Sequence, residues 1–287
     1  MHIVSDRGMD LMPSEMDGLK IHMAPLRIHL DGRTYLSGVD IQTDDFYRLV
    51  MKSKGFPSTS EATADDFAQL YRKLASTDPN ILSIHISSSL SKTVASARVA
   101  VEMVPEANVT IVDTKTLSAA QGWQVYAAAR AAKAGWPLNR IMTLLERIRA
   151  ATETIYTVAT LKYLVHGGRI SHLTGLLASV LDIKPLLGVD KIHGNLVERG
   201  RARSMDAAIV KMVDTIKEQY PLGTAMRLQI VHGHNPEGAA ALRGRLSQMF
   251  QCSWCPTTAV VPVLGAHAGP GMVGVMYAPK SLFPRIP

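Results

Sequence analysis

Hydroxyl side chains are concentrated in one segment of the sequence, ISSSLSKT at residues 86–93. The apolar run ILSIHI leads into it and a helical pattern of small residues follows, so the segment lies where a buried strand passes into a helix. In a helix that begins near Leu90, Ser91 lies at or beside the N-cap and Thr93 in the first turn. Unpaired amides and the helix dipole favour negative charge there, which predicts an anion-binding site. The alternative is an ordinary N-cap on a loop whose other serines face solvent.

Two further segments are also rich in small and polar residues. PSTSEA at residues 57–62 precedes a second predicted helix, and GAHAGPG at residues 265–271 places His267 on a glycine-rich turn. The chain has 14 methionines and many alanines, leucines and valines, so these segments would suit a pocket with one polar end and an apolar body. Methionine also fills gaps in ordinary cores, and the composition alone does not distinguish the two roles.

Three motifs that resemble enzyme or metal sites lack the context that such sites need. GPGMVG at residues 269–274 matches a dinucleotide fingerprint, but the pattern after it is that of a strand rather than a helix. CSWC at residues 252–255 follows a predicted helix instead of opening one, so its thiols are expected to be inert. His232 and His234 have no carboxylate-rich neighbours in the sequence. We therefore predict no catalytic residue, no metal site and no cofactor, and we interpret His85 as a core histidine.

Strands and helices alternate along the first half of the chain, which predicts an α/β domain built on a mostly parallel sheet with flanking helices. We expect one helix with Thr43 as its N-cap and a second in which Thr63 and Asp66 form a capping pair. An alanine-rich helix at residues 118–134 follows, and then a helix that starts at Pro137.

The second half predicts another α/β domain, with a mixed sheet. Helical segments flank the Gly-Gly pair of HGGR, MRLQIVHG is typical of a strand, and Asn235-Pro236 opens a helix. We interpret TTAVVPVLGAHAGPGMVGVMY as two strands that meet at a Gly-Pro-Gly turn. The expected boundary lies near residue 155, which gives domains of residues 1–155 and 156–287.

The composition is that of a globular protein, with 47% hydrophobic and 19% charged residues. The formal net charge is +7, but the basic residues are spread along the chain apart from RGRAR at residues 199–203, so we predict no nucleic-acid partner. Charged residues come too early for a signal peptide, and no apolar run approaches the ~18 residues of a membrane span. With 2 cysteines there is no disulfide framework, and these features predict a cytoplasmic protein.

The sequence resembles the DegV family of bacterial fatty-acid-binding proteins along nearly its whole length. IVSDRGMDLMP is similar to the family's opening IVTDSTADLP, PLRIHLDGRTYLSGVDI to its second block, PSTSEA to PTTSQP, and ISSSLSKTVASA to ISSxLSGTYQSA. LKYLVHGGRIS, LLASVLDIKPLL and GAHAGPGMVG are similar to LxYLxKGGRIS, xLGxLLxIKPIL and GTHxGPGAxG. Each motif is moderately specific, and their shared order along the chain makes the resemblance highly specific.

The resemblance implies two α/β domains with a long-chain fatty acid in the cleft between them. The family's carboxylate ligands correspond to Thr59, Ser91 and His267, with Ser60, Ser88 and Thr93 close by. It further implies that the carrier performs no chemistry but presents the carboxylate to a separate ATP-dependent kinase subunit, which forms an acyl phosphate for phospholipid synthesis. Arg169, Arg201 and Arg203 match positions expected to engage that kinase or its phosphate, although ordinary solvated charge is the alternative for Arg201 and Arg203. Exchange of lipid would involve peripheral contact with a membrane.

Some residues depart from the family's pattern. Arg7 and Gly8 replace hydroxyl residues in the opening motif, and Lys92 replaces a glycine, where it would add positive charge near the head group or extend to solvent. Glu61 replaces a glutamine, and we expect its carboxylate to lie outside the pocket, where it would not oppose an anionic ligand. An alternative function uses the same anion site in an enzyme that acts on a small phosphorylated or carboxylated substrate, with His267 as acid or base.

Overall fold

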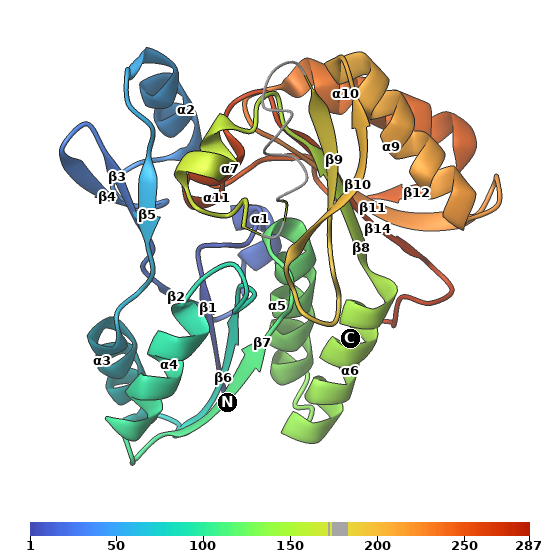
Figure 1. Ribbon diagram of the computed structural model, residues 1–287. Helices are drawn as coiled ribbons and strands as arrows, with labels where there is room; N and C mark the ends of the chain where they lie inside the picture. Colours follow the sequence, from blue (N-terminus) through green and yellow to red (C-terminus); the bar gives the residue numbers. More distant parts are fainter. Residues whose placement is uncertain (172, 174–182) are drawn as a thin grey trace.

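The computed structural model describes residues 1–171, 173 and 183–287, and it contains three sheets (Figure 1). The first sheet has the strand order β2-β1-β6-β7, and every neighbouring pair in it is parallel. Its strands are β1 (His2–Asp6), β2 (Ile21–Ala24), β6 (Asn80–His85) and β7 (Asn108–Asp113). The expected parallel sheet of the first half is confirmed.

Helices cover both faces of the first sheet. Helices α3 (Ala64–Ala75) and α4 (Thr93–Glu102) lie on one face, whereas α5 (Ser118–Lys133) and α6 (Leu138–Ala151) lie on the other side (Figure 1). Because both faces are covered, β6 is buried from its second residue onward: Ile81, Leu82 and Ile84 are each at most 2% exposed, and the polar Ser83 and His85 are fully buried. The expected capping pair is confirmed, since the hydroxyl of Thr63 accepts from the amide of Asp66 and the Asp66 carboxylate accepts from the amide of Thr63.

A small antiparallel sheet, in the order β4-β3-β5, follows β2 in the chain. Its strands are β3 (Arg27–Leu30), β4 (Arg33–Leu36) and β5 (Ser58–Ser60), and α2 (Thr43–Lys52) lies between β4 and β5 in the sequence. The expected Thr43 cap is wrong by one residue. Gln42 is the N-cap, and because Thr43 is already the first helical residue its hydroxyl does not cap the helix. The short helix α1 (Pro13–Met16) precedes β2.

The third sheet is mixed, as the sequence predicts, with the order β10-β9-β8-β14-β11-β12 and with β13 paired to β11. Only β12 and β13 pair with β11 in parallel; the other described neighbours are antiparallel. The strands are β8 (Glu153–Thr157), β9 (Lys184–Val189), β10 (Leu196–Ala202), β11 (Ala225–His232), β12 (Gln251–Trp254), β13 (Thr258–Ala259) and β14 (Val273–Pro279). Helices α9 (Met205–Gln219) and α10 (Pro236–Met249) cover its outer face (Figure 1).

The segment expected to form two strands at a Gly-Pro-Gly turn has a helix in place of most of the first strand. After the two-residue β13, the chain forms α11 (Pro262–Ala268), and β14 follows the turn. Proline at the first helical position lacks the amide that would be unpaired there, and Val261 before it has the extended conformation that a cap requires. His267 therefore lies on a helix and not on the turn. The turn itself has positive φ at Gly269 and Gly271.

The two large sheets are joined through helices and through one hairpin. Helices α5 and α6 lie between them, and α11 packs against α2, β3 and β5, so the small sheet contacts the C-terminal half (Figure 1). The hairpin of β9 and β10 reaches back to the first half, where the Ser89 hydroxyl donates to the carbonyl of His193. The division near residue 155 stays a proposal, and it falls within β8, the first strand of the third sheet.

Candidate functional site

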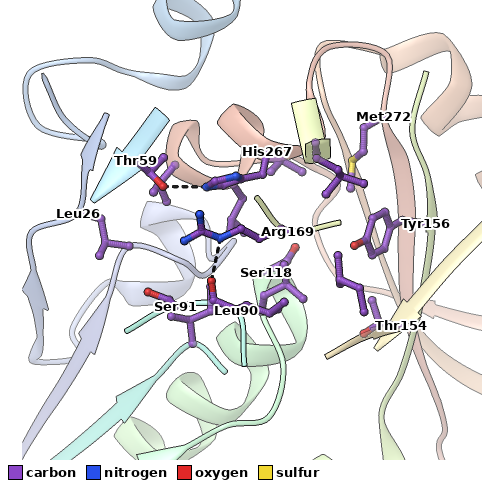
Figure 2. A pocket seen from close by; sticks show the side chains of 18 of the residues that line it. Leu26, Thr59, Leu90, Ser91, Ser118, Thr154, Tyr156, Arg169, His267 and Met272 are labelled. Atoms are coloured by element: carbon purple, nitrogen blue, oxygen red, sulfur yellow. Dashed lines mark hydrogen bonds between the residues drawn. The ribbon is translucent and has the colours of Figure 1, made fainter. Parts of the chain in front are cut away.

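A cavity lies where the three sheets and α11 meet (Figure 2). It holds about 870 Å³ of space between atoms, including the space at its mouth. One part of its wall is polar, with Thr59, Ser60, Ser91, Arg169 and His267. Most of the remainder is aliphatic, and this part includes Leu26, Leu117, Leu196, Val263, Leu264 and Met276. The cavity has a polar part and an apolar body, the kind of pocket that the three polar segments of the sequence would suit.

His267 and Thr59 meet directly in the polar wall, although more than two hundred residues separate them. Thr59 Oγ1 lies 2.8 Å from His267 Nε2 (Figure 2). β5 pairs with β3 and so brings Thr59 alongside α11, which carries His267. The other ring nitrogen, Nδ1, is buried without a hydrogen-bond partner in the described structure. It packs against Gly167, where an added Cβ would lie 2.1 Å from Nδ1, so any other residue there would displace the ring.

The imidazole of His267 is neutral at physiological pH. Burial, and secondly the positive charge of Arg169, lower its pKa from 6.5 to about 3. Arg169 is held in the wall by two carbonyls: its Nε donates to the carbonyl of Leu90 at 3.1 Å and its Nη1 to that of Gly167 at 2.5 Å. The resemblance implies that Arg169 engages the kinase or its phosphate, and the structure places its side chain in the cavity wall beside His267 (Figure 2). Among the described residues that line the cavity, Arg169 is the one lysine or arginine.

The hydroxyl cluster that follows β6 separates into two groups. Ser91 lines the cavity and lies 2.8 Å, Oγ to Oγ1, from Thr93, which is the first residue of α4 and is fully buried. Ser88 points elsewhere, since it is exposed and donates to the carboxylate of Asp113 at the end of β7. The helix begins three residues after Leu90, with Lys92 as N-cap. Of the three predicted residues in this segment, Ser91 therefore lines the cavity, Thr93 supports it and Ser88 does not line it.

Ser60 and Glu61 extend the wall beyond Thr59. Ser60 lines the cavity, but its hydroxyl is 2.9 Å from His29 Nε2. Glu61 also lines the cavity and has no hydrogen bond or ion pair in the described part of the chain, so the expectation that it lies outside is wrong. Glu61 lines the cavity because it directly follows β5, and the chain continues along the cavity wall from there until α3 begins. Arg7 lies apart from this wall and packs against Gly38.

The other two predicted partner-binding residues are on the outer surface. Arg201 is on β10, exposed, and forms an ion pair with Glu198. Arg203 is exposed just beyond the end of β10. The sequence reasoning missed four residues near the cavity: Asp10, Ser118, Thr154 and Tyr156. Ser118, Thr154 and Tyr156 line the cavity. Asp10 is part of the family's opening motif, but the motif alone does not indicate what this residue does.

Asp10 fixes the starts of two helices that border the cavity. It is 1% exposed, and its carboxylate accepts from the Ser118 hydroxyl at 2.5 Å and from the amide of Val261, the N-cap of α11, at 2.8 Å. Burial raises its pKa to about 6, against the opposing effect of these bonds. Ser118 opens α5 with a φ of +60°, a conformation that is uncommon outside glycine. Asp10 thereby positions the helix that carries His267.

The described residues give little support for a metal site, a reactive thiol or a membrane-spanning helix. Within them, no group of three or more His, Cys, Asp or Glu side chains is arranged to hold a metal ion. Burial raises the pKa of both Cys252 and Cys255, which is the opposite of what a reactive thiol needs. None of the described helices is long and apolar enough to cross a membrane.

Comparison with known proteins decides the family. The sequence model of the DegV family, which is described as a family of uncharacterised proteins, matches residues 1–280 of this chain. The chain belongs to the DegV family. It is 35% identical over 283 residues to a DegV domain-containing protein of Deinococcus radiodurans, which covers 97% of this chain and 98% of that protein. A DegV domain-containing protein of Listeria innocua is 30% identical over 279 residues, 97% of this chain and 98% of that one.

Solved structures of DegV proteins have the same fold. A fatty-acid-binding DegV protein of Bacillus subtilis superposes with a TM-score of 0.86 at 27% identity, covering 97% of this chain and 99% of that one. A DegV family protein of Thermus thermophilus, described for its fatty acid binding, has a TM-score of 0.85 at 29% identity, with coverages of 97% and 99%. The predicted family and fold class are therefore confirmed.

Proposed function

We propose that this DegV protein is a carrier that buries a long-chain fatty acid, with the carboxylate at the polar end of the cavity and the hydrocarbon chain along its apolar body. The observation that carries the proposal is the meeting of Thr59 with His267 beside Arg169, at one end of a cavity that is otherwise mainly aliphatic. The fatty acids bound by its relatives in Bacillus subtilis and Thermus thermophilus support it.

Charge compensation explains how a carboxylate is accepted in this place. A buried carboxylate is costly unless charged or polar donors hold it. Arg169 supplies a positive charge, and Thr59 and Ser91 supply hydroxyls. The neutral His267 can donate only from Nε2, beside Thr59, because its Nδ1 is buried against Gly167. The affinity comes from the chain, since each methylene removed from water contributes about 0.8 kcal/mol. The head group therefore sets the orientation and the tail sets the strength.

We further propose that the carrier performs no chemistry of its own and that it presents the carboxylate to a kinase subunit, in the cytoplasm, for conversion to an acyl phosphate. Arg201 and Arg203 are exposed, and they are the residues that we assign to the kinase interface. Arg169, in the cavity wall, is assigned instead to the head group. An interface role predicts that Arg203→Ala weakens kinase binding and leaves the affinity for the fatty acid unchanged.

Native mass spectrometry tests the binding proposal. Protein purified without detergent is expected to carry one fatty acid per chain, and delipidated protein is expected to rebind acids of long chain length. Ser88→Ala is a matched control because this hydroxyl contacts Asp113 and lies outside the cavity lining. Delipidated protein that binds no acid of any chain length would overturn the proposal.

The alternative, an enzyme for a small phosphorylated or carboxylated substrate, predicts a compact polar pocket and turnover by the isolated chain. The mainly aliphatic lining favours the carrier, since a small ionic substrate would leave that surface uncovered. Turnover of such a substrate that is lost in His267→Gln would support the enzyme instead.

A further inference from the structure

Tyr156 places a polar group in the mainly aliphatic part of the cavity wall. Thr154 and Tyr156 are two residues apart on β8, so their side chains leave the same face of the sheet, and both line the cavity. Tyr156 is directly opposite Gly274 on β14, where an added Cβ would lie 2.8 Å from the Cβ of Tyr156. A side chain at position 274 would collide with Tyr156, so glycine there allows the tyrosine ring to occupy this position. Figure 2 shows the phenol oxygen directed into the cavity, on the side away from Thr59 and Ser91.

The hydroxyl of Tyr156 has no hydrogen bond in the described structure, although the residue is only 5% exposed. Other buried tyrosines do have partners: Tyr71 bonds Ser83 at 2.8 Å, and the hydroxyl of Tyr277 donates to Gln219 at 3.0 Å. Burial raises the pKa of Tyr156, and no hydrogen bond opposes that effect. A buried phenol normally finds a partner because leaving one unpaired costs about 1–3 kcal/mol.

A ligand in the cavity is the natural source of that partner. A saturated hydrocarbon chain offers none, and it would bury the phenol more completely without pairing it. Thr154, on the same face, adds a second hydroxyl for which the described residues provide no hydrogen bond. The two form a polar position in a wall that is otherwise mainly aliphatic, separate from the Thr59–His267 pair.

We infer that the ligand class of this carrier is oxygenated acyl chains, fatty acids with a hydroxyl or keto group along the chain, and that Tyr156 determines this specificity by bonding that oxygen. The inference rests on the proposed function and narrows it. It assigns two separate recognition points, a carboxylate end held at Thr59, Ser91, Arg169 and His267, and an in-chain oxygen held at Tyr156 with Thr154 beside it.

Competition binding tests this assignment with defined acids. The probes are octadecanoic acid, a series of monohydroxylated octadecanoic acids that differ in the position of the hydroxyl, and a cis-octadecenoic acid. We expect the wild type to bind at least one hydroxy isomer more tightly than octadecanoic acid. In Tyr156→Phe, the preference for that hydroxy isomer over octadecanoic acid, expressed as the ratio of their Kd values, should decrease by about tenfold. This is the effect of losing one hydrogen bond to a buried partner. Tyr277→Phe, which removes a paired hydroxyl from a strand of the same sheet, should leave the ratio unchanged.

The outcomes separate this inference from the function on which it rests. If octadecanoic acid binds but Tyr156→Phe leaves every hydroxy-to-plain ratio unchanged, the inference is wrong and the carrier function stands. A change in the ratio for the cis-octadecenoic acid alone would also overturn it, because the phenol would then contact a double bond. If no acid binds to the wild type, the proposed function itself fails.

Discussion

Two histidines, the fully buried His85 and the partly buried His267, occupy opposite kinds of environment in this molecule. His85, at the end of β6, has both ring nitrogens paired: Nδ1 lies 3.0 Å from the Asp6 carboxylate and Nε2 lies 2.7 Å from the Ser83 hydroxyl. Tyr71 continues that chain through Ser83, and all of these side chains are fully buried. His267 has one nitrogen on Thr59 and the other without a partner in the described part of the protein.

The difference distinguishes a structural network from a binding site. Burial alone would raise the pKa of Asp6, but hydrogen bonds and charge from His85, with bonds from Ile86 and Gln121, hold it below its ordinary value. In that network the Asp6 carboxylate, both ring nitrogens of His85 and the hydroxyls of Ser83 and Tyr71 all have partners within the protein, so these hydrogen bonds stabilise the fold. The Thr59–His267 pair and the Tyr156 hydroxyl instead face a cavity, where a ligand can bond to them, while Nδ1 of His267 stays buried against Gly167 without a partner among the described residues.

The largest effect is expected from breaking the satisfied network. Asp6→Ala removes the acceptor for His85, Ile86 and Gln121 and leaves Nδ1 of the buried His85 without a partner, so it should lower the free energy of unfolding by about 3–5 kcal/mol. Urea denaturation measures this. The affinity of the remaining folded protein for a fatty acid should be unchanged, and a loss of binding without a loss of stability would reverse the roles of the two regions.

Lowering the pH should destabilise the protein through His267, whose Nδ1 has no hydrogen-bond partner among the described residues. The folded-state pKa of His267 is lowered to about 3, so its contribution to stability is complete above its unfolded pKa of 6.5 and decreases as the pH falls toward 3. Between about pH 7 and pH 4, the wild type should lose on the order of 3 kcal/mol more stability than His267→Asn.

Asp10 contributes to the same pH range with the opposite sign. Its pKa is raised to about 6 in the folded state, so the stability associated with it is present at low pH and is lost as the pH rises through 6. Both proteins retain Asp10, and the difference between their urea midpoints isolates His267. If the stability of the wild type and of His267→Asn depended on pH in the same way, the prediction would be wrong, and the imidazole of His267 would be hydrated in solution.

Single hydroxyl deletions at the cavity should affect binding by a smaller amount. Thr59→Ala and Ser91→Ala are each expected to weaken fatty acid binding by roughly 1–3 kcal/mol, as for the loss of a donor to a buried charge. The double variant should fall short of the sum because both donors would serve one carboxylate. Titration calorimetry gives the three values, with Ser88→Ala as the unaffected control. Full affinity in both single variants would move the head group elsewhere.

The smallest effect is expected for a pair of tyrosines. Tyr71→Phe breaks a paired hydroxyl and should lower stability by about 1 kcal/mol, whereas Tyr156→Phe removes an unpaired one and should leave stability unchanged or slightly raised. Urea denaturation of the ligand-free proteins compares them directly. Equal losses in the two variants would show that Tyr156 is also paired in the ligand-free protein.

The sequence predicts those parts of the fold that local chemistry determines. The capping pair of Thr63 and Asp66 is a contact over three residues, and the apolar run of β6 follows from burial on both faces. The segment TTAVVPVL before His267 predicts a strand because it is rich in β-branched residues, which favour strands. Proline at the first helical position determines the outcome instead.

The candidate site could be predicted in part. The motifs select Thr59, Ser91 and His267, and all three line the cavity. The sequence does not distinguish neighbouring hydroxyls in one segment, because Ser88 bonds to Asp113 at the end of another strand. Tyr156 gives no local signal, since an unpaired hydroxyl becomes apparent only when the tertiary contacts around it are known.

A crystal structure of the delipidated protein soaked with octadecanoic acid tests the central claim most directly. The account predicts one carboxylate within hydrogen-bonding distance of Thr59, Ser91 and His267, near Arg169, with the hydrocarbon chain passing Tyr156 in the apolar body. A chain bound in the reverse direction, or electron density for the acid outside this cavity, would contradict it.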